Sequence, residues 1–222
     1  MKQKPLHIFL DLDLTLVNVF PLWRTRWIKQ LAQRTCLRAD DVYTKGAAIW
    51  ERGDIYTLHG HLRELAIDPE AGWARELQAD FQKRLREGTT NYDDTGAFLD
   101  ALAHHELACS IITFGDRAYQ QLKVDGLGRL DGFFRGVHCT TAPGEKVLIL
   151  HEALKSRCVV FLDDSASEHS QVAVIAPTVH RIQIRRTHQI PCSGDAHHVV
   201  NNLEQALDVI LSLKNNQPKE ST

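Results

Sequence analysis

The sequence predicts an α/β protein with a parallel sheet and a helical insertion after its first strand. From residue 92 on, short apolar runs alternate with segments of helical periodicity, which is the pattern of βα units. Residues 18–90 interrupt that pattern and show helical periodicity alone. Acidic residues follow two of the apolar runs, and ligands of parallel α/β sheets bind beyond the carboxyl ends of the strands. We therefore expect a site at that edge of the sheet.

The first apolar run, residues 6–10, predicts a buried strand because it is too short for a helix and follows a proline. Asp11 and Asp13 come directly after it. Since side chains alternate along a strand, this spacing is expected to turn both carboxylates to the same side. Buried carboxylates repel one another unless a cation or a shared proton intervenes, and a hard divalent cation takes oxygen ligands. The alternative is a turn in which Asp13 and Thr15 bond to nearby backbone.

The insertion contains three or four predicted helices and no convincing strand. Trp23, Trp27 and Leu31 share one face of the first helix, and Leu77, Phe81 and Leu85 repeat at a spacing of four in the last. Acidic residues, a glycine and a proline mark the starts of the later helices. The predicted helices cover residues 20–34, 40–50, 53–65 and 73–87.

The remainder of the chain provides the other strands and the helices between them. Predicted strands cover residues 107–113, 133–140, 158–162 and 179–184. One predicted helix begins at residue 94 or 95. Further predicted helices cover residues 118–127, 145–155, a segment around 172–175, and 203–213. The turn Pro143-Gly144 precedes the helix that begins at Glu145. We expect residues 1–17 and 91–214 to form the α/β core, 18–90 the helical domain, and 215–222 a disordered tail.

Composition narrows the class of protein. The 222 residues are 43 % hydrophobic and 24 % charged, and the formal net charge is −2, so neither a nucleic-acid-binding nor a membrane-binding surface is expected. No run approaches the ~20 apolar residues of a membrane span. Five scattered cysteines, an odd number without a C-x-x-C pair, favour free thiols in a reducing cytosol. We expect a cytoplasmic protein; the sequence does not indicate its oligomeric state.

Reactive residues also mark three later junctions of the predicted α/β core. Thr113 ends one apolar run, Lys146 opens a helix, and Asp163 with Asp164 follows another run, with Glu168 four residues later. Each has an ordinary alternative: a strand residue, a solvated lysine, or a helix cap. Their joint placement at strand ends favours a common site.

This set of residues resembles the motifs of the haloacid dehalogenase (HAD) superfamily, over nearly the whole chain. Residues 11–15 resemble the first motif, Thr113 the second, Lys146 the third and residues 163–168 the fourth. Leu14 departs from the glycine that many members carry. The resemblance implies a three-layer Rossmann-like parallel sheet core, with residues 18–90 as an all-helical cap that closes over the site.

The resemblance also implies the roles of these residues in phosphoryl transfer. Asp11 would attack phosphorus and form an aspartyl-phosphate, while Asp13 would protonate the leaving oxygen and then activate water. Thr113 would donate to a phosphate oxygen. Lys146 would neutralise Asp11 and the phosphate.

A magnesium ion is implied as well, between Asp11, the backbone carbonyl of Asp13, and Asp164. Asp163 would stand beside the ion and orient Lys146 or a water on the ion, and Glu168 would hold another such water. Members that cleave carbon–halogen bonds lack the second aspartate, so Asp13 favours phosphate substrates.

The expected function is therefore a magnesium-dependent phosphatase acting on a small phosphorylated metabolite. Two alternatives stay open: a phosphomutase that uses the same aspartyl-phosphate, and a non-catalytic binding protein on the same scaffold.

Further candidates for substrate contact are Arg24 and Arg26, which begin the insertion, and Phe114 and Gly115 in the turn after Thr113. An arginine there could hold a second anionic group, or both arginines could face water beside packed tryptophans. We expect Arg185-Arg186 to be a solvated strand end. The grouped histidines, His59 and His61, His104 and His105, and His197 and His198, lack zinc-site spacing and are expected on solvated helices or loops.

Overall fold

The computed structural model describes residues 4–129, 132–142 and 144–216, which divide into two compact units. The described residues of the α/β unit lie in the ranges 4–17, 92–114, 129, 132–142 and 144–216, and the helical unit comprises Asn18–Asn91 and Gly115–Gly128. Pro143 of the predicted turn and residues 217–222 of the predicted tail lie outside the described residues. Asn215, which was expected to belong to that tail, is instead the last residue of the helix Leu203–Asn215.

The α/β unit is built on a six-stranded parallel sheet of order β3-β2-β1-β4-β5-β6, in agreement with the predicted fold class. The strands are β1 (Leu6–Leu10), β2 (Ala108–Phe114), β3 (Phe134–Thr140), β4 (Cys158–Asp163), β5 (His180–Ile184) and β6 (His198–Val200). All five residues of β1 are buried, as a central strand covered on both faces requires. The three residues of β6 are too few for the sequence pattern to reveal.

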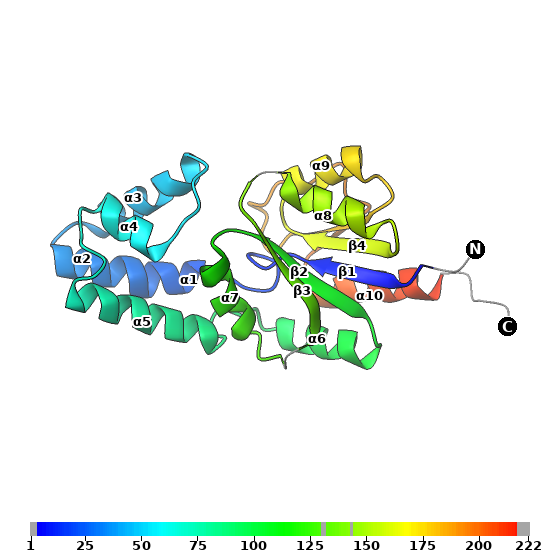
Figure 1. The fold of residues 1–222 in the computed structure, drawn as a ribbon, viewed down its shortest axis with the longest axis horizontal. Helices are drawn as coiled ribbons and strands as arrows, with labels where there is room; N and C mark the ends of the chain where they lie inside the picture. Colours follow the sequence, from blue (N-terminus) through cyan, green and yellow to red (C-terminus); the bar gives the residue numbers. More distant parts are fainter. Residues whose placement is uncertain (1–3, 130–131, 143, 217–222) are drawn as a thin grey trace. The chain divides into compact units, whose positions relative to one another are not determined.

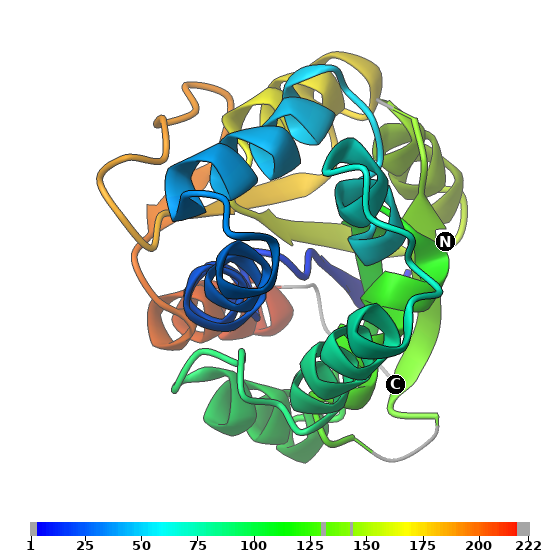
Figure 2. The same ribbon diagram turned by 90° about the vertical axis from the view of Figure 1, so that its left-hand side faces the viewer.

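Helices cover both faces of this sheet and complete the predicted three layers. Figures 1 and 2 show α8 (Glu145–Ala153) and α9 (Ala166–Ile175) on one face, and α6 (Thr95–His104) and α10 (Leu203–Asn215) on the other. Between α8, α9 and the sheet, Phe9, Val147, Phe161 and Val172 belong to one apolar cluster. This packing holds the carboxyl ends of β1 and β4 on a rigid support.

The helical unit consists of α1 (Phe20–Leu22), η1 (Trp23–Ile28), α2 (Lys29–Thr35), α3 (Ala39–Glu51), α4 (Leu58–Glu64), α5 (Gly72–Arg86) and α7 (Arg117–Asp125). The predicted helix 20–34 is present, although its middle, η1, is π-helical. The predicted start at residue 53 is wrong: Gly53 has a φ of +78°, and the helix begins after Thr57, whose hydroxyl accepts a hydrogen bond from the Gly60 N–H.

Helix α7 groups with the helical unit, which differs from the boundary expected from the sequence. The expected core, 91–214, included this helix. Its Leu122 belongs to the same apolar cluster as Phe81, Leu85 and Trp27 of the helical unit. Because burial of apolar surface does not depend on separation along the chain, the contacts of Leu122 decide the grouping.

A buried polar network lies inside this helical unit, and its histidine corrects an expectation. His61 is fully buried, whereas the sequence suggested a solvated position. Its Nε2 atom lies 2.9 Å from the Val42 carbonyl, so Nε2 carries the proton, and Nδ1 accepts from Trp27 Nε1 and from the Tyr56 hydroxyl, each at 3.0 Å. The Tyr56 oxygen in turn accepts from Trp23 Nε1 at 2.6 Å. These bonds satisfy both ring nitrogens of His61.

Candidate functional site

The register of β1 and β4 brings the first and fourth motifs side by side. Leu10 is paired with Leu162, and the Asp11 N–H donates to the Leu162 carbonyl at 2.9 Å. Asp11 and Asp163 therefore occupy neighbouring positions where the two central strands end. Asp163 is fully buried and Asp11 is 4 % exposed, so both side chains are held away from bulk water.

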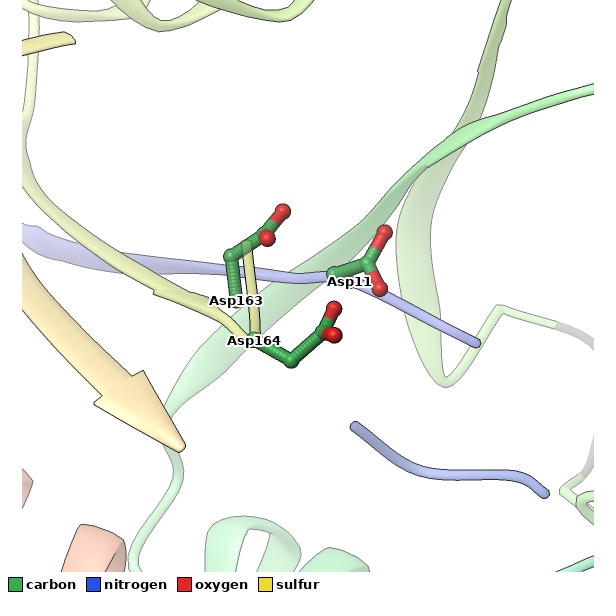
Figure 3. Close-up of side chains that lie close together, drawn as sticks. All are labelled: Asp11, Asp163 and Asp164. Carbon is green, nitrogen blue, oxygen red and sulfur yellow. The ribbon is translucent and has the colours of Figure 1, made fainter. Parts of the chain in front are cut away.

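Three carboxylates converge at this edge of the sheet. Asp11, Asp163 and Asp164 each offer one oxygen, and these oxygens all lie within 4.8 Å of one another. Figure 3 shows the Asp164 carboxylate extending toward that of Asp11. The convergence that the sequence predicted for these three residues is thus present in the structure.

Lys146 supplies a positive charge to this cluster. It lies in the first turn of α8, is 5 % exposed, and its ammonium donates hydrogen bonds of 2.7 Å to Asp11 Oδ1 and to Asp163 Oδ2. Burial by itself would lower the pKa of Lys146, but the two carboxylates raise it well above its usual value. Lys146 is therefore a fixed cation between the first and fourth motifs.

One ammonium does not balance three carboxylates, of which Asp11 and Asp163 are buried and Asp164 is half-buried. Burial raises the pKa of Asp11, and Asp163 and Asp164 raise it further against the opposing effect of Lys146. Burial and the charge of Asp163 likewise raise the pKa of Asp164 to about 7. This excess of negative charge, presented by hard oxygen donors at short mutual distances, fits a divalent cation such as Mg²⁺. Asp11 and Asp164 would hold the ion.

Asp13 lies in a turn, and the argument from strand alternation does not apply to it. β1 ends at Leu10. The chain then folds back, with Leu14 in the left-handed region at φ +59° and its N–H bonded to the Val17 carbonyl at 2.7 Å. A left-handed leucine costs about 1 kcal/mol, which gives a reason why glycine would suit this position. The Asp13 carboxylate is not among the three oxygens that converge, although its charge acts on Asp164.

Thr113 lies one residue before the end of the neighbouring strand, β2. It is 1 % exposed and lies two residues beyond Ile111, the partner of Leu10 in the sheet. Its carbonyl accepts a hydrogen bond from the Thr140 hydroxyl at 3.1 Å. Phe114, the last residue of β2, is 37 % exposed. Gly115 belongs to the helical unit and has a φ of +139°, so a side chain there would be strained.

Ser165, which caps α9, and His169 in its first turn hold Asp163 in place, and no role was predicted for either of them from the sequence. The Ser165 N–H donates to Asp163 Oδ1 at 2.7 Å, and His169 Nε2 donates to the Asp163 carbonyl at 3.1 Å. A serine after two acids, at the start of a helix, was the available signal for Ser165. Glu168 lies between them, with its Oε2 buried and without a hydrogen-bond partner among the described residues. Burial raises the pKa of Glu168.

The two arginines proposed for substrate contact belong to the helical unit. The Arg24 guanidinium lies 5.0 Å from the centre of the Tyr43 ring, so cation–π stacking accounts for its position. Arg26 lines a small cavity of about 190 Å³ together with residues that include Trp73 and Glu76. Their role in substrate binding stays a prediction.

The environment of Arg186 differs from the solvated strand end that the sequence predicted. Its side chain is 8 % exposed and forms an ion pair with Asp94, with Nη1 2.7 Å from Oδ2. Arg185, its neighbour, bonds instead to the Ile190 carbonyl of the following loop at 2.9 Å. Two adjacent arginines give no signal in the sequence that would separate these environments, because the difference depends on residues about ninety positions away.

Comparisons with known proteins identify the fold. No protein-family model and no curated protein sequence matches the chain. Solved structures do match over nearly their whole length: a HAD phosphatase from Thermococcus onnurineus (TM-score 0.65, 18 % identity, covering 94 % of this chain and 98 % of that one) and the L-2-haloacid dehalogenase from Xanthobacter autotrophicus with chloropropionic acid covalently bound (TM-score 0.64, 14 % identity, 95 % and 100 %).

A third match is a Bacillus subtilis protein described as a HAD-hydrolase and bound to magnesium (TM-score 0.62, 16 % identity, 94 % and 99 %). The chain therefore has the fold of the HAD-superfamily hydrolases, and the fold that the motif resemblance implied is confirmed. Proteins with this fold include both phosphatases and haloacid dehalogenases, so the reaction has to be argued from the site. None of the helices in the described part of the chain combines the length and hydrophobicity of a membrane crossing.

Proposed function

We propose that this chain is a magnesium-dependent phosphatase of the HAD superfamily, which hydrolyses a small phosphomonoester through an aspartyl-phosphate on Asp11. The observation that carries the proposal is the convergence of Asp11, Asp163 and Asp164 with only Lys146 to balance them among the described residues. Attack of a carboxylate on a carbon–halogen bond does not require a divalent cation, whereas transfer of a highly charged phosphoryl group depends on charge neutralisation. The site therefore favours phosphate over halide chemistry.

The first half-reaction uses Asp11 as the nucleophile. One carboxylate oxygen forms a bond to phosphorus while the bond from phosphorus to the leaving oxygen breaks, and Asp13 gives its proton to that oxygen. Lys146 holds the Asp11 carboxylate at 2.7 Å and offsets negative charge on the phosphoryl group. When bound between Asp11 and Asp164, Mg²⁺ would supply further neutralisation of that charge.

The second half-reaction returns the protein to its starting state. Asp13, now ionised, accepts a proton from a water molecule whose oxygen attacks phosphorus, and the bond from phosphorus to Asp11 breaks. Inorganic phosphate leaves, Asp13 is protonated again, and Asp11 is ionised. Atoms and charges therefore balance over one turnover.

The test is release of inorganic phosphate from a panel of phosphorylated metabolites, measured with Mg²⁺ and with a chelator. We expect turnover of at least one ester with Mg²⁺, its loss with the chelator, and its loss in Asp11→Asn while the circular dichroism spectrum is unchanged. Glu152→Gln, an exposed acid near the end of α8, serves as the control and should keep full activity. Wild-type rates in Asp11→Asn would contradict the mechanism.

Product analysis separates this function from the alternatives. A phosphomutase would release an isomerised phosphate ester and little free phosphate. Stabilisation by Mg²⁺ without hydrolysis of any ester would favour a binding protein on the same scaffold.

A further inference from the structure

We propose that Arg186 is a positioning residue for the proposed phosphatase reaction: it holds the turn of residues 12–17 so that Asp13 is aligned to protonate the leaving oxygen. The inference rests on the proposed function and extends it to a residue outside the four motifs. Its starting point is a hydrogen bond of 2.8 Å from Arg186 Nη2 to the Thr15 carbonyl, two residues after Asp13.

The turn itself is short and strained, so its orientation depends on outside contacts. Inside it, the Leu16 and Val17 N–H groups both bond to the Leu12 carbonyl at 2.9 Å, and Leu14 takes a left-handed conformation. These bonds shape the turn, and its orientation in the α/β unit depends on the packing of the buried Leu12, Leu16 and Val17 and on hydrogen bonds from outside the turn. A small rotation of the turn would move the Asp13 carboxylate while leaving Asp11 on the end of β1.

Two consecutive carbonyls at the far end of the turn receive the outside contacts. The Leu16 carbonyl accepts from the Thr95 hydroxyl at 2.7 Å and from the Tyr92 N–H at 3.1 Å. The Thr15 carbonyl accepts from Arg186. Of these donors to the turn, Arg186 alone is a charged side chain, and its bond acts on the residue nearer to Asp13.

Arg186 is itself held by a planar, charged partner. The Asp94 carboxylate receives two hydrogen bonds from the guanidinium, 2.7 Å from Nη1 and 3.0 Å from Nη2. Its Oδ2 also accepts from the Leu203 N–H at 2.9 Å, at the start of α10. The Tyr92 ring lies 4.0 Å from the guanidinium carbon. Bidentate pairing, stacking and the bond to Thr15 together require the planar fork of an arginine, which lysine cannot reproduce.

Tyr92, the residue that stacks on Arg186, links it electrostatically to the proposed site. Burial has the largest effect and raises the pKa of Tyr92, Arg186 lowers it, and the charges of Asp164, Asp94 and Asp13 raise it. Two carboxylates of the proposed site therefore act on the same ring that contacts the guanidinium. Loss of Arg186 would disturb the turn within reach of these groups.

Dependence of the rate on the leaving group tests this role. A general acid contributes roughly 10²–10⁴-fold when the leaving oxygen needs a proton, and little when it does not. The ratio kcat/KM, which reports the first half-reaction, is measured for ethyl phosphate, whose alkoxide needs a proton, and for 4-nitrophenyl phosphate, whose phenolate does not. We expect Arg186→Met to lower kcat/KM for ethyl phosphate by about 10²-fold and for 4-nitrophenyl phosphate by less than about 10-fold.

Three further variants serve as comparisons for Arg186→Met. Asp13→Asn should show the same discrimination between the two esters to a larger extent, and Arg186→Lys should restore little of the loss. Arg185→Met is the matched control, because Arg185 bonds to carbonyls of its own loop, and it should leave both rates unchanged.

The inference is overturned if Arg186→Met lowers kcat/KM equally for the two esters. It is also overturned if circular dichroism shows that both Arg186 variants are unfolded. Either result would assign Arg186 a purely structural role. A wild-type protein that hydrolyses neither ester nor any metabolite of the panel would contradict the proposed function itself, and with it the role of Arg186. An active wild type with equal losses would contradict the role of Arg186 alone.

Discussion

The Lys146 ammonium lies 2.7 Å from Asp11 Oδ1, although 135 residues separate the two in the chain. The same nitrogen lies 2.7 Å from Asp163 Oδ2. A single buried cation therefore links the end of β1, the end of β4 and the start of α8. This link is the structural centre of the proposed site.

Replacing Lys146 with methionine leaves buried carboxylates without their ammonium partner. We expect the free energy of unfolding at pH 7, measured by urea denaturation without Mg²⁺, to fall by about 3–5 kcal/mol. Phosphatase activity should fall by at least about 10²-fold. Lys155→Met removes an exposed lysine paired with Glu152 and should change stability by less than about 0.5 kcal/mol. Equal stability of the two variants would show that Lys146 does not balance the cluster.

Mg²⁺ is expected to stabilise the folded protein through the carboxylate cluster. At a free concentration of 100 times Kd, binding adds about 2.7 kcal/mol to the free energy of unfolding, visible as a rise in Tm. Asp164→Asn should abolish the rise, because it removes a predicted ligand. Asp163→Asn should reduce it less, because Asp163 bonds to Lys146 and Ser165. Glu152→Gln should behave as wild type, and an undiminished Tm rise in Asp164→Asn would exclude this site for the ion.

His61 is expected to make the helical unit sensitive to acid. Burial lowers the pKa of His61, and a proton on Nδ1 would face the Trp27 and Tyr56 donors. Below the ordinary histidine pKa of about 6.5, the unfolded chain binds a proton at His61 that the folded protein does not bind. The contribution of His61 to the free energy of unfolding is therefore complete above about pH 6.5. It is lost as the pH falls below that value, by up to about 1.4 kcal/mol per pH unit.

The measurement is denaturant unfolding followed by tryptophan fluorescence at pH 5 and pH 7.5. His61→Gln should lose stability at pH 7.5 but depend less on pH than the wild type does. His59→Gln, at an exposed position on the same helix, should retain the wild-type dependence. An unchanged dependence in His61→Gln would show that another group is responsible.

Asp94 is expected to stabilise the folded protein at neutral pH and to lose this effect in acid. Burial by itself would raise the pKa of Asp94, but hydrogen bonds from Arg186 and Leu203 lower it overall. Its contribution to stability is therefore present above the ordinary aspartate pKa of about 3.9 and is lost as the pH falls through the lowered value.

Asp94→Asn should accordingly be less stable than the wild type at pH 7, with a difference that shrinks below about pH 4. Unfolding curves of the two proteins from pH 7 to pH 3 measure this difference, and Asp208→Asn on α10 is the control. A difference that stays constant over the range would contradict the ionic role of Asp94.

The order of elements and the identity of the acids could be predicted from the sequence because both leave local signals. Apolar runs such as 6–10 and 158–162 show where strands form, and acids directly after them mark the edge of a parallel sheet. That Asp11 and Asp163 become neighbours followed from the expected parallel arrangement, and the register of Leu10 with Leu162 agrees with it.

Other features were missed or wrong because they depend on contacts between distant residues. His61 was expected in solvent, since a helical histidine gives the same signal in the sequence whether or not tryptophans from another helix cover it. Arg186 and Arg185 are indistinguishable in sequence, yet Asp94 selects one of them. The Asp13 turn departs from strand alternation because β1 already ends at Leu10 and the chain then folds back through a left-handed Leu14, a conformation that its residue type does not predict.

The sequence by itself thus determined the α/β class, the helical insertion and the acids that could meet at one edge, because periodicity and strand ends are properties of short segments. The tertiary structure alone decided how the Asp13 turn is held, which of two adjacent arginines pairs with Asp94, and which helix of the core sequence joins the helical unit. Those outcomes depend on burial and hydrogen bonding between residues up to 171 positions apart, as in the contact of Arg186 with Thr15.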